Sequence, residues 1–279
     1  MIFLDPKSDI AFKKLFSSTE HANILINFLN TILLLPEGRR ITEVHINDPH
    51  NHPETKSSKA SIVDVRCTDK KGTQYIVEMQ VINQEDYAVR AQYYVAVALA
   101  RQLQQGEDFI KLMPVIFIGI VNFTIFSSPE YLSSHYIVNV ATGERTLSAQ
   151  EYHFIELTKF NKSLDEITSD VDKWIYFFKN AKKLETVPEQ FHKPQALQEA
   201  FKILEQGNWT VKELESYERN MDIARREKGY LATARNEGLK EGSKKKAQAI
   251  AKQLLHFHDS ATIAQITGLT IAEVEELKK

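Results

Sequence analysis

The sequence predicts an α/β fold in which a mixed central sheet is flanked by helices and followed by a C-terminal helical region. Three observations lead to this prediction. Residues 61–81 alternate between polar and apolar side chains on both sides of a short glycine-containing segment, as in two strands joined by a turn. Residues 112–123 are mostly apolar and rich in β-branched side chains, as in a buried strand. After Lys159 the apolar residues recur at helical spacing, and this order of elements predicts a sheet with helices packed on it.

Composition and charge limit the class of protein. The chain has 279 residues, 43% hydrophobic and 26% charged, which is a globular composition with room for one large and one smaller domain. The net charge of −2 means that any nucleic-acid binding would depend on local patches. The single cysteine, Cys67, excludes an internal disulfide and is expected in the core. The opening residues lack the features of a signal peptide and no segment has the length of a membrane span, so we expect a cytoplasmic protein with no membrane partner.

The first part of the chain is predicted to form a helix and a strand. Apolar residues at helical spacing predict one helix over 8–34, with Ser8 or Asp9 as its N-cap. Residues 42–48 alternate between polar and apolar and predict a strand. The polar segment 49–61 is predicted to be a loop.

The predicted hairpin brings two acids together. Its turn consists of residues 70–72, and a three-residue loop with glycine in the left-handed conformation is a favoured hairpin connection. With this loop Asp69 pairs with Thr73, and Asp64 then lies opposite Glu78. Two carboxylates in this arrangement have Cβ atoms roughly 5 Å apart and repel each other. A divalent cation between them would explain the arrangement, because hard cations prefer carboxylate oxygens.

Further elements complete the predicted sheet and its helical cover. Asn83 is the candidate N-cap of a helix over 84–105, and residues 151–157 alternate as in a strand. The apolar face of the helix over 84–105 is expected to pack on the sheet and consists of Ala91, Val95, Ala98 and Leu99. Three more helices are predicted over 163–182, over 195–206 and from Thr210 onward.

The C-terminal region is predicted to be a linker helix followed by a small helical unit. Residues 225–246 are dominated by Arg, Lys, Glu and Gly and predict a solvated, partly flexible linker. Residues 247–279 have the spacing of three short helices, and the last two resemble a helix-turn-helix. The last helix carries three glutamates ahead of two lysines, which suits a phosphate-lined groove poorly. We therefore expect a protein-contact or dimerisation unit, with residues 244–246 as weak contacts to a DNA backbone.

The hairpin also carries a family resemblance. Val63 and Asp64, followed by the Glu-Met-Gln of residues 78–80, resemble the Asp…Glu-x-Lys active site of the PD-(D/E)XK nuclease superfamily. The chain is similar to the branch of recombination-promoting nucleases and transposases, and five blocks carry this similarity in order: DPKSDIAFKKLF, SIVDVRC, IVEMQ, RAQYYVAVALARQL and LMPVIFIGIVNF. The resemblance implies a restriction-endonuclease-like nuclease core. We divide the chain into this core at 1–160, a helical extension at 161–235, and a flexible linker with a small helical unit at 236–279.

The resemblance implies a Mg²⁺-dependent DNA endonuclease, with Mn²⁺ as a substitute and no small-molecule cofactor, whose cleavage promotes DNA recombination or transposition. Asp64 and Glu78 are the implied catalytic residues and metal ligands. Asp9 is the implied third metal ligand, and capping of the first helix is its alternative role. Gln80 occupies the position of the usual lysine and is implied to orient water or phosphate. We expect a homodimer, because nucleases that act on duplex DNA often cut as a pair.

Lys13, Arg90 and Tyr94 are the candidate contacts to the DNA backbone. Arg90 and Tyr94 lie four residues apart and so share one face of their predicted helix. In the alternative interpretation Lys13 belongs to a solvated helix face, while Arg90 and Tyr94 are surface and boundary residues. Asn83 and Gln84 follow the metal-binding strand directly and are expected to line the same cleft.

Gln80 also favours a different class of function. A glutamine keeps a donor and an acceptor but carries no charge. The alternative is therefore a catalytically weak or inactive nuclease-fold protein that acts as a DNA-binding or assembly module. A defence role against invading DNA would use the same chemistry as the nuclease. The sequence contains no phosphate-binding loop, dinucleotide fingerprint or Ser-His-Asp elbow, and zinc spacing is absent among His45, His50, His52 and His135.

Overall fold

The computed structural model describes residues 2–48, 50–51 and 61–278. The chain forms two compact units, Met1–Asn220 and Met221–Lys279. Each helix in the described part of the chain is too short or too polar to cross a membrane. The finer division into a core, an extension and a tail stays a prediction.

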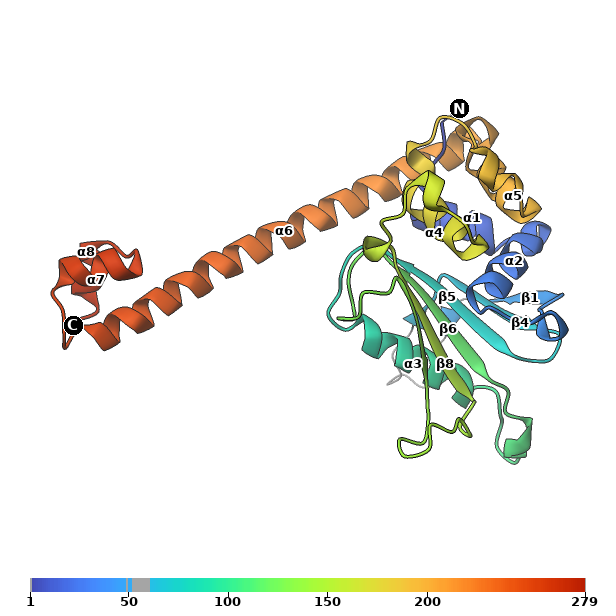
Figure 1. Cartoon of the computed structure of the whole chain (residues 1–279), viewed down its shortest axis with the longest axis horizontal. Coiled ribbons are helices and arrows are strands. Elements are labelled where there is room, and N and C mark those ends of the chain that lie inside the picture. The colour runs from blue at the N-terminus through green and yellow to red at the C-terminus, as the bar shows by residue number, and fades with distance from the viewer. Residues whose placement is uncertain (1, 49, 52–60, 279) are drawn as a thin grey trace. The chain divides into compact units, whose positions relative to one another are not determined.

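A mixed six-stranded sheet lies at the centre of the first unit (Figure 1). Its strand order is β1-β4-β5-β6-β8-β7, with parallel pairing of β5 with β6 and of β6 with β8, and antiparallel pairing elsewhere. The strands are Val44–Asn47 (β1), Val65–Asp69 (β4), Gln74–Gln80 (β5), Val115–Val121 (β6), Leu132–Tyr136 (β7) and Gln150–Glu156 (β8). The predicted mixed sheet is therefore confirmed.

Helices flank the sheet. Figure 1 shows α3 on one side of the sheet, with α1, α2, α4 and α5 grouped on the other. Their bounds are Asp9–Phe16 (α1), Ala22–Ile32 (α2), Tyr87–Ala100 (α3), Asp170–Asn180 (α4) and Gln195–Leu204 (α5). Short 3₁₀ helices connect the elements at Thr19–His21, Glu37–Arg39, Phe109–Lys111, Leu157–Lys159, Leu164–Glu166, Ala181–Lys183, Glu189–His192 and Gln206–Asn208.

The predicted single helix over 8–34 is wrong, because the chain breaks it into α1 and α2. Ser8 is the N-cap of α1, and its hydroxyl accepts a hydrogen bond from the backbone N–H of Ala11. Ser17 closes this helix, and Ser18 is extended. Short hydroxyl side chains compete with helical hydrogen bonding, so two consecutive serines favour the end of a helix.

The turn of the central hairpin is confirmed. The N–H of Asp69 donates to the carbonyl of Thr73 at 3.0 Å, and Gly72 has a left-handed φ of +91°. The register also follows the prediction, since Val65 pairs with Val77. The first strand of the hairpin is shorter than predicted, because β4 begins at Val65 and Asp64 immediately precedes it.

The predicted loop over 49–61 contains strand at its described ends. His50–Asn51 (β2) pairs antiparallel with Ser61–Ile62 (β3). Position 49 and positions 52–60, which include His52, lie outside the described residues. Strand β7 was not predicted, because Leu132–Tyr136 is mostly polar and only half-buried and so lacks a clear apolar alternation.

Helix α3 is shorter than the predicted helix over 84–105. Its N-cap is Asp86 rather than Asn83, and the N–H of Tyr87 closes a turn onto the carbonyl of Gln84. The C-terminal end is set by Gln102, whose side-chain amide exchanges two hydrogen bonds with the backbone of Met113. The predicted apolar face is confirmed, since all four of its residues are buried, and they pack with Ile76, Phe117 and Phe154 of the sheet.

Helix α5 begins and ends close to its predicted position. Helix α4 begins later than predicted because Ser169 and Asp172 form a capping box at its start. The long helix α6 spans Val211–Leu254 and continues through the glycines of the predicted linker, so the first of the three short helices predicted over 247–279 is wrong and is the end of α6.

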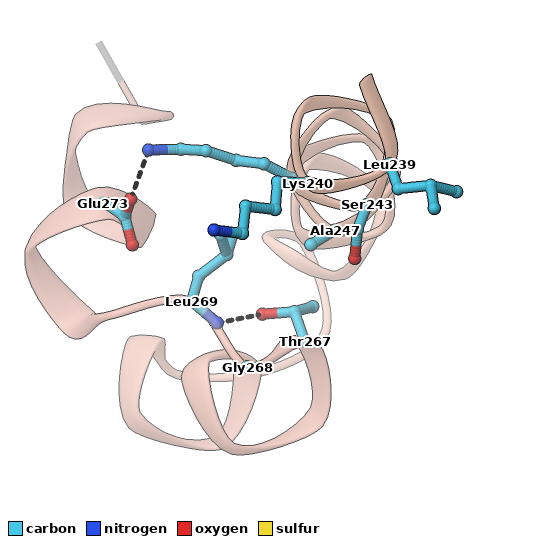
Figure 2. A pocket seen from close by; sticks show the side chains of 9 residues that line it. Leu239, Lys240, Ser243, Ala247, Thr267, Gly268, Leu269 and Glu273 are labelled. Atoms are coloured by element: carbon cyan, nitrogen blue, oxygen red, sulfur yellow. Dashed lines mark hydrogen bonds and ion pairs between the residues drawn. The ribbon is translucent and has the colours of Figure 1, made fainter. Parts of the chain in front are cut away.

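The second unit contains α7 (Ser260–Thr267) and α8 (Ile271–Glu276), joined at a left-handed Gly268. Its small apolar core consists of Ala251, Ile263, Leu269 and Val274. Figure 2 shows an open hollow in this unit between Leu239, Lys240 and Ser243 of α6 and the turn at Thr267, Gly268 and Leu269. An ion pair between Lys244 and Glu273, 2.7 Å between Nζ and Oε1, joins α6 to α8.

Candidate active site

Asp64 and Glu78 are brought together by the hairpin. Glu78 lies on β5, is 6% exposed, and shares with Ile76 the face of the strand that packs against α3. Asp64 is half-buried immediately before β4. Its Oδ2 accepts a hydrogen bond of 2.7 Å from the backbone N–H of Met79. The Asp64 carboxylate is thus tied to the residue that follows Glu78.

The electrostatics of this acidic pair favour a bound proton or cation. The pKa of Glu78 is raised to about 8, chiefly by burial, with a further increase from the neighbouring Asp64 and a partial decrease from Arg90. The pKa of Asp64 is raised to about 6, also chiefly by burial, against the lowering effect of the hydrogen bond from Met79. Both carboxylates therefore hold protons more tightly than they would in water, because burial disfavours their charged forms.

The donor set of the pair fits a hard divalent cation. Glu78 Oε2 is buried and accepts no hydrogen bond within the part of the chain that the structure describes. The cationic group nearest the other oxygen is Arg90, with Nη2 3.8 Å from Oε1. A buried carboxylate oxygen without a partner is costly, and Mg²⁺ and Mn²⁺ take such oxygens as ligands.

Asp9 is not brought into the same cluster as a third acid. It is exposed in the first turn of α1, where its Oδ1 lies 2.7 Å from Nζ of Lys13. Among the described residues, no three His, Cys, Asp or Glu side chains form a group that could hold a metal. Asp9 and Lys13 still act on Asp64 electrostatically, since the first raises and the second lowers its pKa. The sequence prediction for these two residues stays a prediction.

Gln80 and Arg90 form one hydrogen-bonded unit beside Glu78. The amide nitrogen of Gln80 donates to the carbonyl of Ile82 at 3.0 Å, which orients its oxygen. That oxygen accepts from Arg90 Nη2 at 3.3 Å, and Arg90 also donates to the side-chain oxygen of Gln84. The two glutamines therefore hold a guanidinium next to the uncharged position where the superfamily usually has lysine.

Tyr94 lies deeper than an exposed DNA contact would. It is 9% exposed and packs in the apolar cluster between α3 and the sheet. Burial raises the pKa of its phenol, and the charge of Glu78 raises it further. The phenol thus senses the charge of Glu78, and a DNA contact through it stays a prediction.

Sequence reasoning missed Tyr87, the first residue of α3. It is 2% exposed, and its hydroxyl has no hydrogen-bond partner among the described residues. A Cβ atom at Gly119 would lie 2.6 Å from this hydroxyl, and Gly119 is the register partner of Glu78 on β6. The available signal was the glycine within the otherwise apolar run of β6, because a glycine inside a buried strand often marks a close approach.

The mixed six-stranded sheet and its flanking helices define an α/β fold of the PD-(D/E)XK nuclease type. The family model described as PD-(D/E)XK nuclease family transposase matches residues 6–234. The chain belongs to this family, which confirms the resemblance found in the sequence and the predicted restriction-endonuclease-like fold. The family gives the protein a nuclease or transposase-related role and implies DNA as its substrate. No curated protein and no solved structure shows significant similarity to the chain.

Proposed function

We propose that the protein is a metal-dependent DNA endonuclease that hydrolyses phosphodiester bonds and promotes DNA recombination or transposition. The observation that carries this proposal is the buried acidic pair, in which Glu78 Oε2 has no partner within the described residues. Mg²⁺ is the proposed cofactor, and Mn²⁺ substitutes for it because it prefers the same oxygen ligands. No small-molecule cofactor is part of the proposal.

Asp64 and Glu78 are the proposed catalytic residues and metal ligands. A bound divalent ion would supply charge stabilisation on the attacking water and on the leaving oxygen. Met79 orients Asp64 through its backbone N–H, so one oxygen of that carboxylate has a fixed direction. Asp9 is the proposed third ligand and would exchange its present partner, Lys13, for the cation.

Gln80, Arg90, Lys13 and Tyr94 are the proposed contacts to water and the DNA backbone. Gln80 orients the guanidinium of Arg90, whose positive charge suits a phosphate oxygen. Lys13 is partly exposed near Asp64 and offers a second positive charge. Tyr94 would contribute through its hydroxyl, since its ring is buried.

A plasmid cleavage assay tests the proposal. Purified wild-type protein should convert supercoiled plasmid to nicked or linear forms with Mg²⁺ but not with EDTA. Asp64→Ala should abolish this cleavage while circular dichroism shows a folded protein. Glu85→Ala removes an exposed acid just before α3 and serves as the matched control. Cleavage that persists in Asp64→Ala, or that is insensitive to EDTA, would contradict the proposal.

One observation favours a second candidate function, a nuclease-fold protein that binds DNA or assembles on it without cutting. Both ends of the Gln80 amide are engaged within the protein, and the side chain carries no charge. Wild-type protein that shifts duplex DNA in a gel but leaves plasmid intact at every Mg²⁺ and Mn²⁺ concentration would support this candidate.

The assembly state and the setting are also proposals. We propose a homodimer, because nucleases that act on duplex DNA often cut as a pair. We propose that the C-terminal unit is a protein-contact element, because Glu275 and Glu276 are exposed on α8 and suit a phosphate-lined groove poorly. Light scattering of the full chain and of a chain ending at residue 235 would test whether the tail holds the dimer. We propose a cytoplasmic location, where the single cysteine stays reduced.

A further inference from the structure

Two buried polar atoms without partners belong to side chains at neighbouring strand positions, Glu78 on β5 and the Tyr87 hydroxyl over Gly119 on β6. One is Glu78 Oε2 and the other is the hydroxyl oxygen of Tyr87, and neither has a hydrogen bond within the described residues. Their charges interact, since Glu78 raises the pKa of the Tyr87 phenol after burial has done so. Buried hydroxyls and carboxylates are usually hydrogen-bonded, so two adjacent exceptions call for a common explanation.

The Tyr87 ring is fixed in place by its neighbours. Its centroid lies 6.3 Å from that of Phe117, 5.8 Å from that of Phe123 and 6.3 Å from that of Phe154, each in an edge-to-face arrangement. Such contacts favour one ring orientation. The hydroxyl is thereby directed toward the sheet at Gly119.

Gly119 makes room for this hydroxyl. A side chain there would place Cβ 2.6 Å from the Tyr87 oxygen, 3.0 Å from Phe117 and 3.1 Å from Phe154. In the parallel register Gly119 lies directly beside Glu78. The phenol therefore ends over the strand position that neighbours the acidic side chain.

We propose that Tyr87 is a positioning residue for Glu78. The absence of a side chain at Gly119 leaves the space that the Tyr87 hydroxyl occupies. The hydroxyl donates to the orphan oxygen of Glu78, Oε2, which keeps a second lone pair for the cation, and thereby fixes the direction of the carboxylate. This hydrogen bond gives both orphan atoms a partner. The role in cation binding rests on the proposed function, whereas the contact between the two side chains does not.

Tyr87→Phe is the main test, because it keeps the ring and removes only the hydroxyl. In calorimetric titrations of the full chain with Mn²⁺, we expect the dissociation constant to rise about 10- to 100-fold, as is typical when an outer-shell partner of a ligand is lost. Tyr152→Phe is the matched control, since Tyr152 packs on the same cluster and bonds to Gln150 instead. It should leave Mn²⁺ affinity unchanged. Wild-type affinity in Tyr87→Phe would overturn the proposal.

Gly119→Ala tests whether the missing side chain at this position makes room for the Tyr87 hydroxyl. The new methyl group would displace the Tyr87 hydroxyl, so Mn²⁺ affinity should fall as it does in Tyr87→Phe. The Tyr87→Phe, Gly119→Ala double variant has no hydroxyl for the new methyl group to displace. Its Mn²⁺ affinity should therefore equal that of Tyr87→Phe alone. Additive losses of Mn²⁺ affinity in the double variant would show that Gly119 acts independently of Tyr87 and would overturn the role proposed for Gly119.

A measurement without metal separates this inference from the proposed function. Tyr87→Phe should lower the unfolding temperature of the metal-free protein by about 2–4 °C, the size expected for loss of one hydrogen bond. The same substitution should cause no loss in the Glu78→Met variant, which lacks the acceptor. Equal losses in both backgrounds would overturn the contact. A wild-type protein that binds no Mn²⁺ would refute the proposed function. The unfolding temperatures of the metal-free variants would still show whether Tyr87 and Glu78 form a hydrogen bond.

Discussion

Two buried glutamates in the same sheet have opposite surroundings. Glu156 ends β8 and is fully buried, and its carboxylate accepts from the N–H groups of Ile125 at 2.5 Å and Phe126 at 3.2 Å and from Lys159 Nζ at 2.5 Å. Glu78 lies two strands away, has one oxygen without a partner in the described structure, and has its nearest cation at 3.8 Å. The complete shell around Glu156 marks a structural carboxylate. The incomplete shell around Glu78 supports the metal-ligand role proposed for it.

The largest expected difference between the two glutamates is in catalysis. Glu78→Gln should reduce plasmid cleavage to background, because the amide loses the charge that binds the cation. Glu156→Gln should keep the Mg²⁺ requirement and cleavage in whatever fraction of the protein is folded. Initial rates normalised to folded protein measure both. Full cleavage activity in Glu78→Gln would contradict the catalytic role proposed for Glu78.

The second difference is in stability and runs the other way. Glu156→Ala should lower the free energy of unfolding by about 3–5 kcal/mol, because it leaves Lys159 buried without its counter-ion. Glu78→Gln should leave that free energy unchanged or raise it, since it relieves repulsion from Asp64. Urea titrations at pH 7.5 without metal measure these values. A Glu78→Gln variant as unstable as Glu156→Ala would mean that Glu78 is structural too.

The third difference is a pH dependence produced by the acidic pair. The pKa of Asp64 is raised from 3.8 to about 6 and that of Glu78 from 4.5 to about 8. The folded state thus holds protons that the unfolded chain has already released. Stability of the metal-free protein should therefore be highest below the unfolded pKa values and fall as the pH rises through the folded ones. The loss is on the order of 1.4 kcal/mol for each unit of pKa difference.

Urea titrations between pH 4.5 and 9 check this dependence. The Asp64→Asn, Glu78→Gln double variant should have a much flatter profile over the same range. Mn²⁺ should stabilise the wild type more at pH 8.5 than at pH 5.5, because the cation and the protons compete for the same oxygens. A wild-type profile that matches the double variant would contradict the raised pKa values.

The smallest expected effect is that of Gln80→Lys. The ammonium would lie near Glu78 and supply the charge that the superfamily usually has at this position. Arg90 would lose one acceptor but keep its hydrogen bond to Gln84. We expect cleavage to be retained or raised, as measured by initial rates at saturating Mg²⁺. Complete loss of cleavage, with folding and metal binding intact, would count against the assigned role of Gln80.

Much of the fold was predictable because it depends on local patterns. The alternation around Gly72 predicted the hairpin and its register, and the apolar run of β6 predicted a buried strand. The break between α1 and α2 was not predicted, since apolar spacing continues on both sides of Ser17 and Ser18. Strand β7 escaped prediction because an edge strand with polar residues has no periodic apolar signal.

The candidate site was predictable only where its residues are close in sequence. Asp64, Glu78 and Gln80 belong to one hairpin, so turn geometry and family resemblance pointed to them. The contact of Arg90 with Gln80 needed the true start of α3, which the capping prediction placed too early. Tyr87 was missed, because an aromatic residue in the first turn of a helix resembles ordinary core, and the glycine in the apolar run of β6 indicates a close approach without indicating which residue approaches.

The parallel pairing of β5 with β6 means that the site has a local half and a distant half. In an isolated peptide of residues 61–81 water would surround both acids, and their ionisation would be close to that of free side chains. Asp64 and Glu78 are buried only when β6 pairs with β5 and α3, which connects the two strands, packs on the sheet. The hairpin thus supplies the two acids, and the long-range closure of the chain buries them and raises their pKa values.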